Sequence, residues 1–277
     1  MEEEEKLSLE KQAKKIRQRI LKLVYGAQSG HPGGSLSIAD IMTYLYFKEL
    51  KVDPKNPNDP NRDRLVLSKG HCAPASYAAL IEKGFIDESE AEKFRQVDGV
   101  LQGHPDMKHT PGVDMTTGSL GQGLSAAVGM ALAAKMDQKD YRVFCILGDG
   151  ELEEGQVWEA AMAAAHYKLD NLYVIIDRNN LQIDGETEKV LNPNPIYKKF
   201  REFGFDCMVV DGHDFYEISD AMEDTQFTEG MPTAIIAQTI KGKGVSFMEG
   251  KAEWHGKAPN EEEYQKALEE LEGACHE

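Results

Sequence analysis

Short segments of continuous apolar residues recur along the chain. They are RLVLS (64–68), YRVFCIL (141–147), NLYVIID (171–177), DCMVVD (206–211) and TAIIAQT (233–239). Continuous rather than alternating apolar character is typical of parallel strands that are covered on both faces. Segments with helical spacing lie among them, at 37–50, 73–84, 122–136, 154–168 and 215–224. This alternation predicts an α/β fold with a doubly wound, mostly parallel sheet flanked by helices.

The two ends of the chain carry charged helical patterns. Residues 1–28 predict an N-terminal helical extension, and the acidic segment 261–273 predicts a solvated helix. Neither internal repeats nor a low-complexity linker divides the sequence. Because open α/β architectures extend to about 250 residues in one unit, we expect residues 1–277 to form a single domain.

The loops that follow the predicted strands are the places to look for chemistry. In an open α/β sheet, ligands bind outside the carboxyl ends of the strands. The loops concerned are SKGHCAP (68–74), GDGELEEG (148–155), DRNNLQIDG (177–185), DGHD (211–214) and IKGKG (240–244).

Charge narrows the possible partners. The chain has 31 basic and 48 acidic residues, a net charge of -17, which argues against binding to nucleic acid or to an anionic membrane. An anionic ligand therefore needs local positive charge or a metal.

Cysteine usage and the N-terminus indicate the compartment. The four cysteines are far apart and form no C-x-x-C pair: Cys72, Cys145, Cys207 and Cys275. The charged N-terminus lacks the apolar core of a signal peptide, and no run approaches about 18 apolar residues. We expect a cytoplasmic protein with reduced thiols.

The GDG stretch combines two features that conflict. Glycines beside Asp149 let the backbone approach a ligand, and the following helix directs its free N–H groups there, as in a phosphate site. Yet Asp149, Glu151, Glu153 and Glu154 would repel a phosphate. A divalent cation resolves the conflict, since Mg²⁺ prefers oxygen ligands and binds carboxylates together with phosphate oxygens. Asp149 is the candidate first ligand.

The next predicted strand supplies further oxygen ligands. Neighbouring parallel strands deliver their following loops to the same edge, so Asn179 can offer its amide oxygen and Leu181 its backbone carbonyl. The expected result is a metal that holds a diphosphate. Glu151 and Glu153 are interpreted mainly as residues that favour the helix N-terminus.

The order strand, GDG, helix, strand and Asn-Asn matches the motif of enzymes that bind thiamine diphosphate through Mg²⁺. A nicotinamide-binding Rossmann site fits less well, because Glu153 replaces the third glycine of G-x-G-x-x-G. No G-x-x-x-x-G-K-[ST] sequence is present.

Four histidines lie in glycine-containing loops: His31, His71, His104 and His255. Loop imidazoles can donate to phosphate, orient sugar hydroxyls or move protons near neutral pH. Together they favour a polar reaction cleft, although each alone is as readily a structural residue. None pairs at zinc-like spacing. The others are interpreted as structural: His109, His166, His213 and His276.

With these loops in place, the chain resembles the transketolases, specifically their N-terminal diphosphate-binding half. The resemblance covers almost the whole sequence, in order. Its motifs are SGHPGGSLS, RDRLVLSKGHCAPA, LQGHPD, TTGSLGQGLSAAVGMA, GDGELEEGQVWEA, DRNNLQIDG and KGKGVSFMEGKAEWHGKAP.

The resemblance implies a set of cofactor-binding residues. Asp149, Asn179 and the Leu181 carbonyl would bind Mg²⁺, with Ca²⁺ or Mn²⁺ as possible substitutes. The residues implied to contact thiamine diphosphate, or to supply positive charge beside it, are Lys69, His71, Gly118, Leu120, Gly148, Gly150, Glu151, Asn179, Ile183, Lys241 and His255. Within that set, Gly118 would contact the aminopyrimidine through its backbone.

It also implies catalytic residues. His31, His104 and His255 would line the cleft around the sugars and assist proton transfer, His71 would lie at the reacting centre, and Glu154 would belong to a network across a dimer. The sequence departs from many relatives at Ser119, where they have proline. A looser turn should still allow the Gly118 contact.

The implied reaction moves a two-carbon ketol unit from a ketose phosphate to an aldose phosphate, with the cofactor carrying the unit. Full-length relatives continue into a pyrimidine-binding domain that this chain does not contain. We therefore expect a split transketolase, active only with a separate C-terminal subunit in an α2β2 assembly. Small residues between 123 and 134, and at 160–165, would suit such an interface or, equally, helix-on-sheet packing.

Two alternatives remain open at this stage. One is a different thiamine diphosphate enzyme, such as the α subunit of a 2-oxo acid dehydrogenase or a deoxyxylulose-phosphate synthase, which the histidine loops and WHGKAP disfavour. The other is a non-catalytic homologue, which the retention of Asp149, Asn179 and the loop histidines disfavours.

Overall fold

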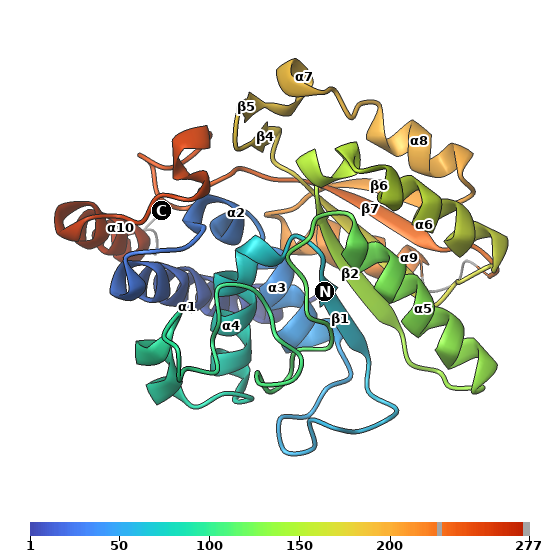
Figure 1. The fold of residues 1–277 in the computed structure, drawn as a ribbon, viewed down its shortest axis with the longest axis horizontal. Helices are drawn as coiled ribbons and strands as arrows, with labels where there is room; N and C mark the ends of the chain where they lie inside the picture. Colours follow the sequence, from blue (N-terminus) through green and yellow to red (C-terminus); the bar gives the residue numbers. More distant parts are fainter. Residues whose placement is uncertain (226–228, 274–277) are drawn as a thin grey trace.

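The computed structural model of the chain describes residues 1–225 and 229–273. Its centre is a parallel five-stranded sheet in the order β1-β2-β3-β7-β6 (Figure 1). The strands are β1 (Arg64–Leu67), β2 (Val143–Gly148), β3 (Leu172–Arg178), β6 (Asp206–Asp211) and β7 (Thr233–Gln238). Each coincides with a predicted apolar segment, and the predicted doubly wound α/β fold is confirmed.

Helices cover both faces of the sheet. The main ones are α1 (Glu3–Ala27), α3 (Ala39–Tyr44), α4 (Ala73–Lys83), α5 (Gln122–Met136), α6 (Gly155–His166), α8 (Ile196–Glu202), α9 (Phe215–Thr225) and α10 (Glu261–Gly273). Residues of α1, α3, α4 and α9 share one buried apolar cluster, and those of α5, α6 and α8 share the other. Figure 1 shows α5 and α6 side by side across the sheet from α1 and α4.

The alternation of strand side chains explains the continuous apolar segments. In β2, Phe144 and Ile146 belong to the first cluster, whereas Val143, Cys145 and Leu147 belong to the second. Because successive side chains of a strand point to opposite faces, both sets must be apolar when both faces are covered.

Several short elements differ from the sequence expectation. The predicted helix over 37–50 is interrupted at Ile38: α2 (Pro32–Ser37) precedes it, α3 follows, and a π-helical turn occupies Leu45–Glu49. Helix α8 was not predicted. Neither were the hairpin of β4 (Leu181–Gln182) and β5 (Gly185–Glu186) and the turn α7 (Thr187–Val190).

Within the described residues, no helix is both long and apolar enough to cross a membrane. Cys72, Cys145 and Cys207 are free thiols. Cys275 and His276 lie outside the described part of the chain.

Candidate cofactor-binding site

A cavity of about 350 Å³ opens at the carboxyl ends of the strands. Its wall contains every predicted site residue except His104 and Glu154. These are His31, Lys69, His71, Gly118, Leu120, Gly148, Asp149, Gly150, Glu151, Asn179, Leu181, Ile183, Lys241 and His255, joined by Gly34 and Gln182, which were not predicted. The strand order brings segments from both ends of the sequence to one place.

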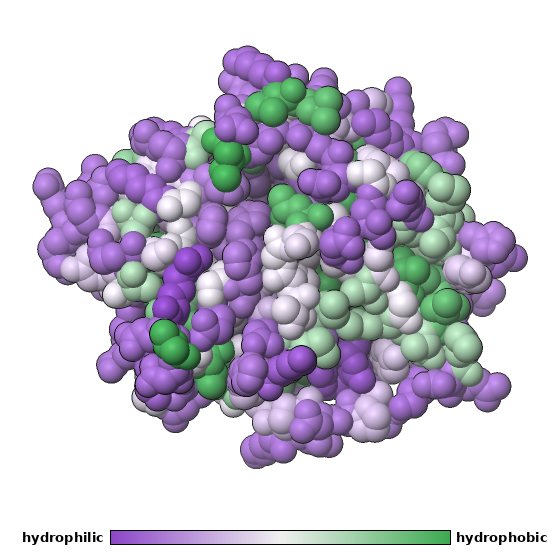
Figure 2. Space-filling view, viewed as in Figure 1, coloured by the Kyte–Doolittle hydropathy of each residue, from purple (hydrophilic) through white to green (hydrophobic). Residues whose placement is uncertain are grey.

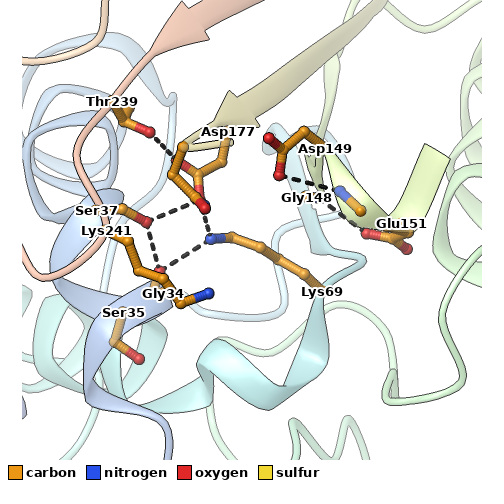
Figure 3. Close-up of polar contacts among 12 residues, drawn as sticks. Gly34, Ser35, Ser37, Lys69, Gly148, Asp149, Glu151, Asp177, Thr239 and Lys241 are labelled. Carbon is orange, nitrogen blue, oxygen red and sulfur yellow. Dashed lines mark hydrogen bonds and ion pairs between the residues drawn. The ribbon is translucent and has the colours of Figure 1, made fainter. Parts of the chain in front are cut away.

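Asp177, at the end of β3, is the centre of a buried polar network (Figure 3). Its Oδ2 accepts hydrogen bonds from Lys69 Nζ at 2.5 Å and from Ser37 Oγ at 2.7 Å, and its Oδ1 accepts one from Thr239 Oγ1. Burial alone would raise the pKa of Asp177, but the Lys69 charge and the hydrogen bonds lower it below the usual value. Lys69 also donates to the Gly34 carbonyl at 2.9 Å. The charge of Lys69 is therefore largely compensated inside the protein.

Asp149 is a second buried carboxylate at the next strand end, and only 2% of it is exposed. Its Oδ1 accepts the Gly150 N–H at 3.0 Å and its Oδ2 the Asn180 N–H at 2.6 Å. No Lys or Arg within residues 1–225 and 229–273 forms an ion pair with it. Burial and the negative charge of Asp177 raise its pKa to about 7. A cation at this position would stabilise the ionised form.

Asn179 is oriented by the Asp177 network. Its Nδ2 donates to Asp177 Oδ2 at 2.7 Å, so its Oδ1 is directed away and accepts the Leu181 N–H at 3.1 Å. The Leu181 carbonyl accepts from Lys241 Nζ at 3.4 Å. Each of these oxygens has a further lone pair. A hard cation could thus find carboxylate, amide and carbonyl ligands on two adjacent loops.

The described residues contain no group of three or more His, Cys, Asp or Glu side chains arranged to hold a metal. A cation in this cavity would therefore depend on the amide and carbonyl oxygens, and on oxygens of the ligand itself.

Glu151 corrects the interpretation of this residue as one that only favours a helix N-terminus. It is buried in the 3₁₀ turn Gly150–Glu153, accepts from Ser68 Oγ, and also accepts the N–H groups of Gly121 at 2.9 Å and Gly148 at 3.1 Å. Burial raises its pKa. The carboxylate joins three loops of the cavity wall. Glu153 instead accepts from Gln182 Nε2 at 2.6 Å.

Three histidines meet on the cavity wall. The ring centroids of His31 and His71 are 5.1 Å apart, those of His31 and His255 are 5.4 Å apart, and those of His71 and His255 are 5.0 Å apart. Burial, followed by nearby positive charge, lowers the pKa of His31 to about 4 and that of His255 to about 3, and places the pKa of His71 lower still. All three are therefore neutral at pH 7.

Lys241 adjoins this cluster. Its Nζ lies 3.0 Å from His255 Nδ1, and because an ammonium can only donate, Nδ1 is the acceptor and the neutral ring carries its proton on Nε2. Lys241 is 2% exposed, and burial lowers its pKa. It is the cation that faces the Asp149 side of the cavity.

His104 and Glu154 lie outside the cavity wall. His104 is exposed and borders a neighbouring hollow that shares Gly118 with the cavity. Gly118 has φ +148, and a Cβ there would lie 2.9 Å from His104 Cδ2, so glycine is required. Glu154 is exposed and precedes α6.

Sequence reasoning missed Asp177, Ser37, Thr239 and Gln182. Asp177 had a signal: an aspartate that ends a strand covered on both faces needs a buried partner. The identity of that partner, Lys69, had none.

Comparison with known proteins follows this geometry. The family described as transketolase, thiamine diphosphate binding domain, matches residues 8–274. A subunit of the apulose-4-phosphate transketolase of Phocaeicola vulgatus is 44% identical over 95% of this chain and 94% of its own length. The SqwG subunit of the 6-deoxy-6-sulfo-D-fructose transketolase of a Clostridium species is 47% identical over 97% of this chain and 98% of its own.

Longer relatives match in part of their length. Human transketolase is 44% identical over 90% of this chain, which spans 40% of the human protein. The crystal structure of Campylobacter jejuni transketolase superposes with a TM-score of 0.91 at 39% identity, over 95% of this chain and 42% of that one. The chain belongs to the family of transketolase thiamine diphosphate-binding domains.

Proposed function

We propose that this chain is the N-terminal subunit of a two-subunit transketolase, which transfers a two-carbon ketol unit from a ketose phosphate to an aldose phosphate. The observation that carries the proposal is Asp149, a buried carboxylate without an ion-pair partner in the described residues, beside Asn179 in the cavity at the strand ends. Relatives of the same length are named as transketolase subunits.

Magnesium-bound thiamine diphosphate fits the residues present. Asp149, the Asn179 amide oxygen and the Leu181 carbonyl would hold Mg²⁺, and Ca²⁺ or Mn²⁺ could replace it because they prefer the same ligands. The raised pKa of Asp149 supports this assignment, since a bound cation would relieve the cost of its ionised form. When bound, thiamine diphosphate supplies the electron sink for breaking and forming the carbon–carbon bond.

The chain's own residues then bind and orient. The Lys241 ammonium and the Gly150 N–H would contact the diphosphate, while His71 and His255 would lie between it and the reacting centre. As neutral imidazoles, they can donate or accept a proton at pH 7 without first losing one. Leu120 and Ile183, 36% and 65% exposed at the rim, would contact the apolar parts of the cofactor.

The sugar would occupy the outer part of the cleft. His31 lies on the cavity wall against His71 and His255, and His104 lies beyond Gly118. From these positions they would donate to substrate hydroxyls and assist proton transfer. Two relatives carry the names of different sugars, so the choice of sugar is a separate question from the reaction type.

A partner subunit would complete the site. Gly129 and Ala133 on α5 are exposed together with Met136, and Met162 is exposed on α6. Figure 2 shows the resulting pale and green surface over these two helices. We propose that this face contributes to an α2β2 assembly with a pyrimidine-binding subunit, in which exposed Glu154 would become buried. Free thiols at Cys72, Cys145 and Cys207 are compatible with a cytoplasmic protein.

The test combines the purified chain with its co-purified partner in the presence of thiamine diphosphate and Mg²⁺. Xylulose 5-phosphate with ribose 5-phosphate, apulose 4-phosphate, 6-deoxy-6-sulfofructose and pyruvate are offered as substrates. We expect ketol transfer only when both subunits are present. Full activity of the chain alone would overturn the two-subunit proposal.

Two further outcomes address the alternatives. Consumption of pyruvate instead of a ketose would favour a 2-oxo acid enzyme. Cofactor binding without turnover on any substrate would favour a non-catalytic homologue.

A further inference from the structure

Lys241 lies on a segment that cannot fix its own position. Residues 240–244 follow β7 without regular structure, and Gly242 and Gly244 adopt φ values of +81 and +93. Glycines give such a segment high conformational freedom. Holding a buried ammonium in place therefore requires contacts from other elements.

Two side chains from distant elements hold the flanks of Lys241. On one side, the Ile240 N–H donates to His213 Nε2 at 2.9 Å. On the other side, Arg17 Nε donates to the Lys243 carbonyl at 3.2 Å. His213 lies between β6 and α9, and Arg17 lies on α1.

Both holding residues converge on one carboxylate, that of Asp40 on α3. Arg17 NH1 donates to Asp40 Oδ1 at 2.8 Å and NH2 to Oδ2 at 2.5 Å, while His213 Nδ1 lies 2.7 Å from Oδ2. Asp40 is 5% exposed and Arg17 8%. Burial alone would raise the pKa of Asp40, but the Arg17 charge and the His213 hydrogen bond lower it to about 2. The carboxylate is ionised throughout the neutral range.

The hydrogen-bond pattern fixes the tautomer of His213. Because the Ile240 amide can only donate, Nε2 of the ring must be the unprotonated nitrogen. Nδ1 then carries the proton and donates it to Asp40. The aspartate thus presents to Ile240 the ring nitrogen that can accept.

We infer that Asp40 is a positioning residue for cofactor binding, acting through His213 and Arg17 on the two flanks of Lys241. The inference rests on the proposed function, because it takes Lys241 as the residue that contacts the diphosphate. Stability alone is a weak reason for such a cluster, since a buried ion pair often contributes little compared with apolar packing.

The chain offers a matched control. Asp114 is also buried, pairs with Arg62, and accepts the Leu65 N–H at 2.8 Å. It lies beside the start of β1, at the edge of the sheet opposite the cavity. Its loss should affect the fold without affecting Lys241.

The experiment uses the assembled enzyme and measures thiamine diphosphate affinity by calorimetry, together with kcat at saturating cofactor. For Asp40→Asn we expect the Kd of the cofactor to rise about tenfold or more, the scale found when residues that orient a binding group are removed. We expect kcat at saturation to change much less. Asp114→Asn should lower the Tm comparably and leave the Kd unchanged.

A second pair of variants separates positioning from folding. His213→Gln retains an acceptor for the Ile240 N–H and a donor for Asp40, whereas His213→Leu has neither. We expect Gln to restore most of the cofactor affinity that Leu loses. An unchanged Kd in folded Asp40→Asn, or equal Kd values for the Gln and Leu variants, would overturn the inference.

The proposed function fails in a different way. If the wild-type assembly does not bind thiamine diphosphate, or if Lys241→Ala binds it unchanged, the role assigned to Lys241 is wrong. Binding in the wild type with loss in Lys241→Ala, but no effect of Asp40, removes only the positioning role.

Discussion

The Asp149 backbone N–H donates to the Asp177 carbonyl at 3.2 Å, which places two buried aspartates at the ends of neighbouring strands. Their electrostatic situations are opposite. Lys69 compensates the charge of Asp177 and lowers its pKa, whereas burial and the charge of Asp177 raise the pKa of Asp149 to about 7. Asp177 is therefore committed to the protein's own structure, and Asp149 remains available to a ligand.

Replacing Asp149 with asparagine should separate stability from binding. In the unliganded chain at pH 8, Asp149→Asn removes a buried charge close to another, so we expect the free energy of unfolding to rise by roughly 1–3 kcal/mol. In the assembled enzyme the same change should abolish Mg²⁺-dependent cofactor binding. Urea unfolding and calorimetry measure the two effects.

Asp177→Asn is the matched control for that experiment. It leaves the Lys69 charge buried without its partner, so we expect a loss of about 3–5 kcal/mol. Equal effects of the two substitutions on stability would contradict the contrast drawn between these carboxylates.

His31 should make the unliganded chain sensitive to mild acid. Burial, with the charge of Arg95 and other neighbours, lowers its folded pKa from 6.5 to about 4. Between these pH values the unfolded chain binds a proton that the folded chain does not. The stabilisation is thus complete above pH 6.5 and is lost as the pH falls towards 4.

His31→Gln tests this pH dependence. Because His31 is partly open to solvent, we expect the variant to remove only about 1–2 kcal/mol of the wild-type loss between pH 7.5 and pH 5. Urea unfolding at both values measures it. His166→Gln, an exposed position at the end of α6, should retain the wild-type profile, and a profile unchanged by His31→Gln would refute the assignment.

The sheet could be predicted because its signal is local. Both faces of β2 and β3 are buried, so their segments are apolar at every position. Parallel strands bring their following loops to one edge, which is enough to assemble Asp149, Asn179 and Lys241. Helix α8 escaped because its few residues carry little periodicity and follow a Pro- and Asn-rich loop.

The partners within the site could not be predicted in the same way. Lys69 and Asp177 are separated by 108 positions and Asp40 and His213 by 173, and no local pattern pairs them. Glu151 was misinterpreted for a similar reason. A glutamate at a helix N-terminus is common, and only the fold shows that three loops converge on its carboxylate.

The role of Glu151 in joining those loops predicts a specific order of variants. Glu151→Ala leaves the Gly121 and Gly148 N–H groups without their acceptor, so we expect a loss of about 2–4 kcal/mol. Glu151→Gln retains one acceptor oxygen and should cost less. Urea unfolding of the isolated chain decides the order, and an alanine variant as stable as the wild type would contradict it.

A glycine on α5 can test whether the α5–α6 face binds the partner. Gly129 is exposed, and a Cβ there would meet no atom within 4 Å. Gly129→Gln should therefore stabilise the isolated chain by about 0.5–1 kcal/mol, because glycine is a poor helix former. If the face is an interface, the longer side chain should obstruct close approach and weaken association with the partner, as measured by titrating one subunit into the other.

The control is Gly26→Gln on α1, at another exposed helical glycine without neighbours within 4 Å. It should give the same gain in stability and leave association unchanged, since α1 lies on the other side of the sheet. Activity of Gly129→Gln should then return only at higher partner concentration. If both variants associate with wild-type affinity, the partner binds elsewhere, and the exposed small residues of α5 need another explanation.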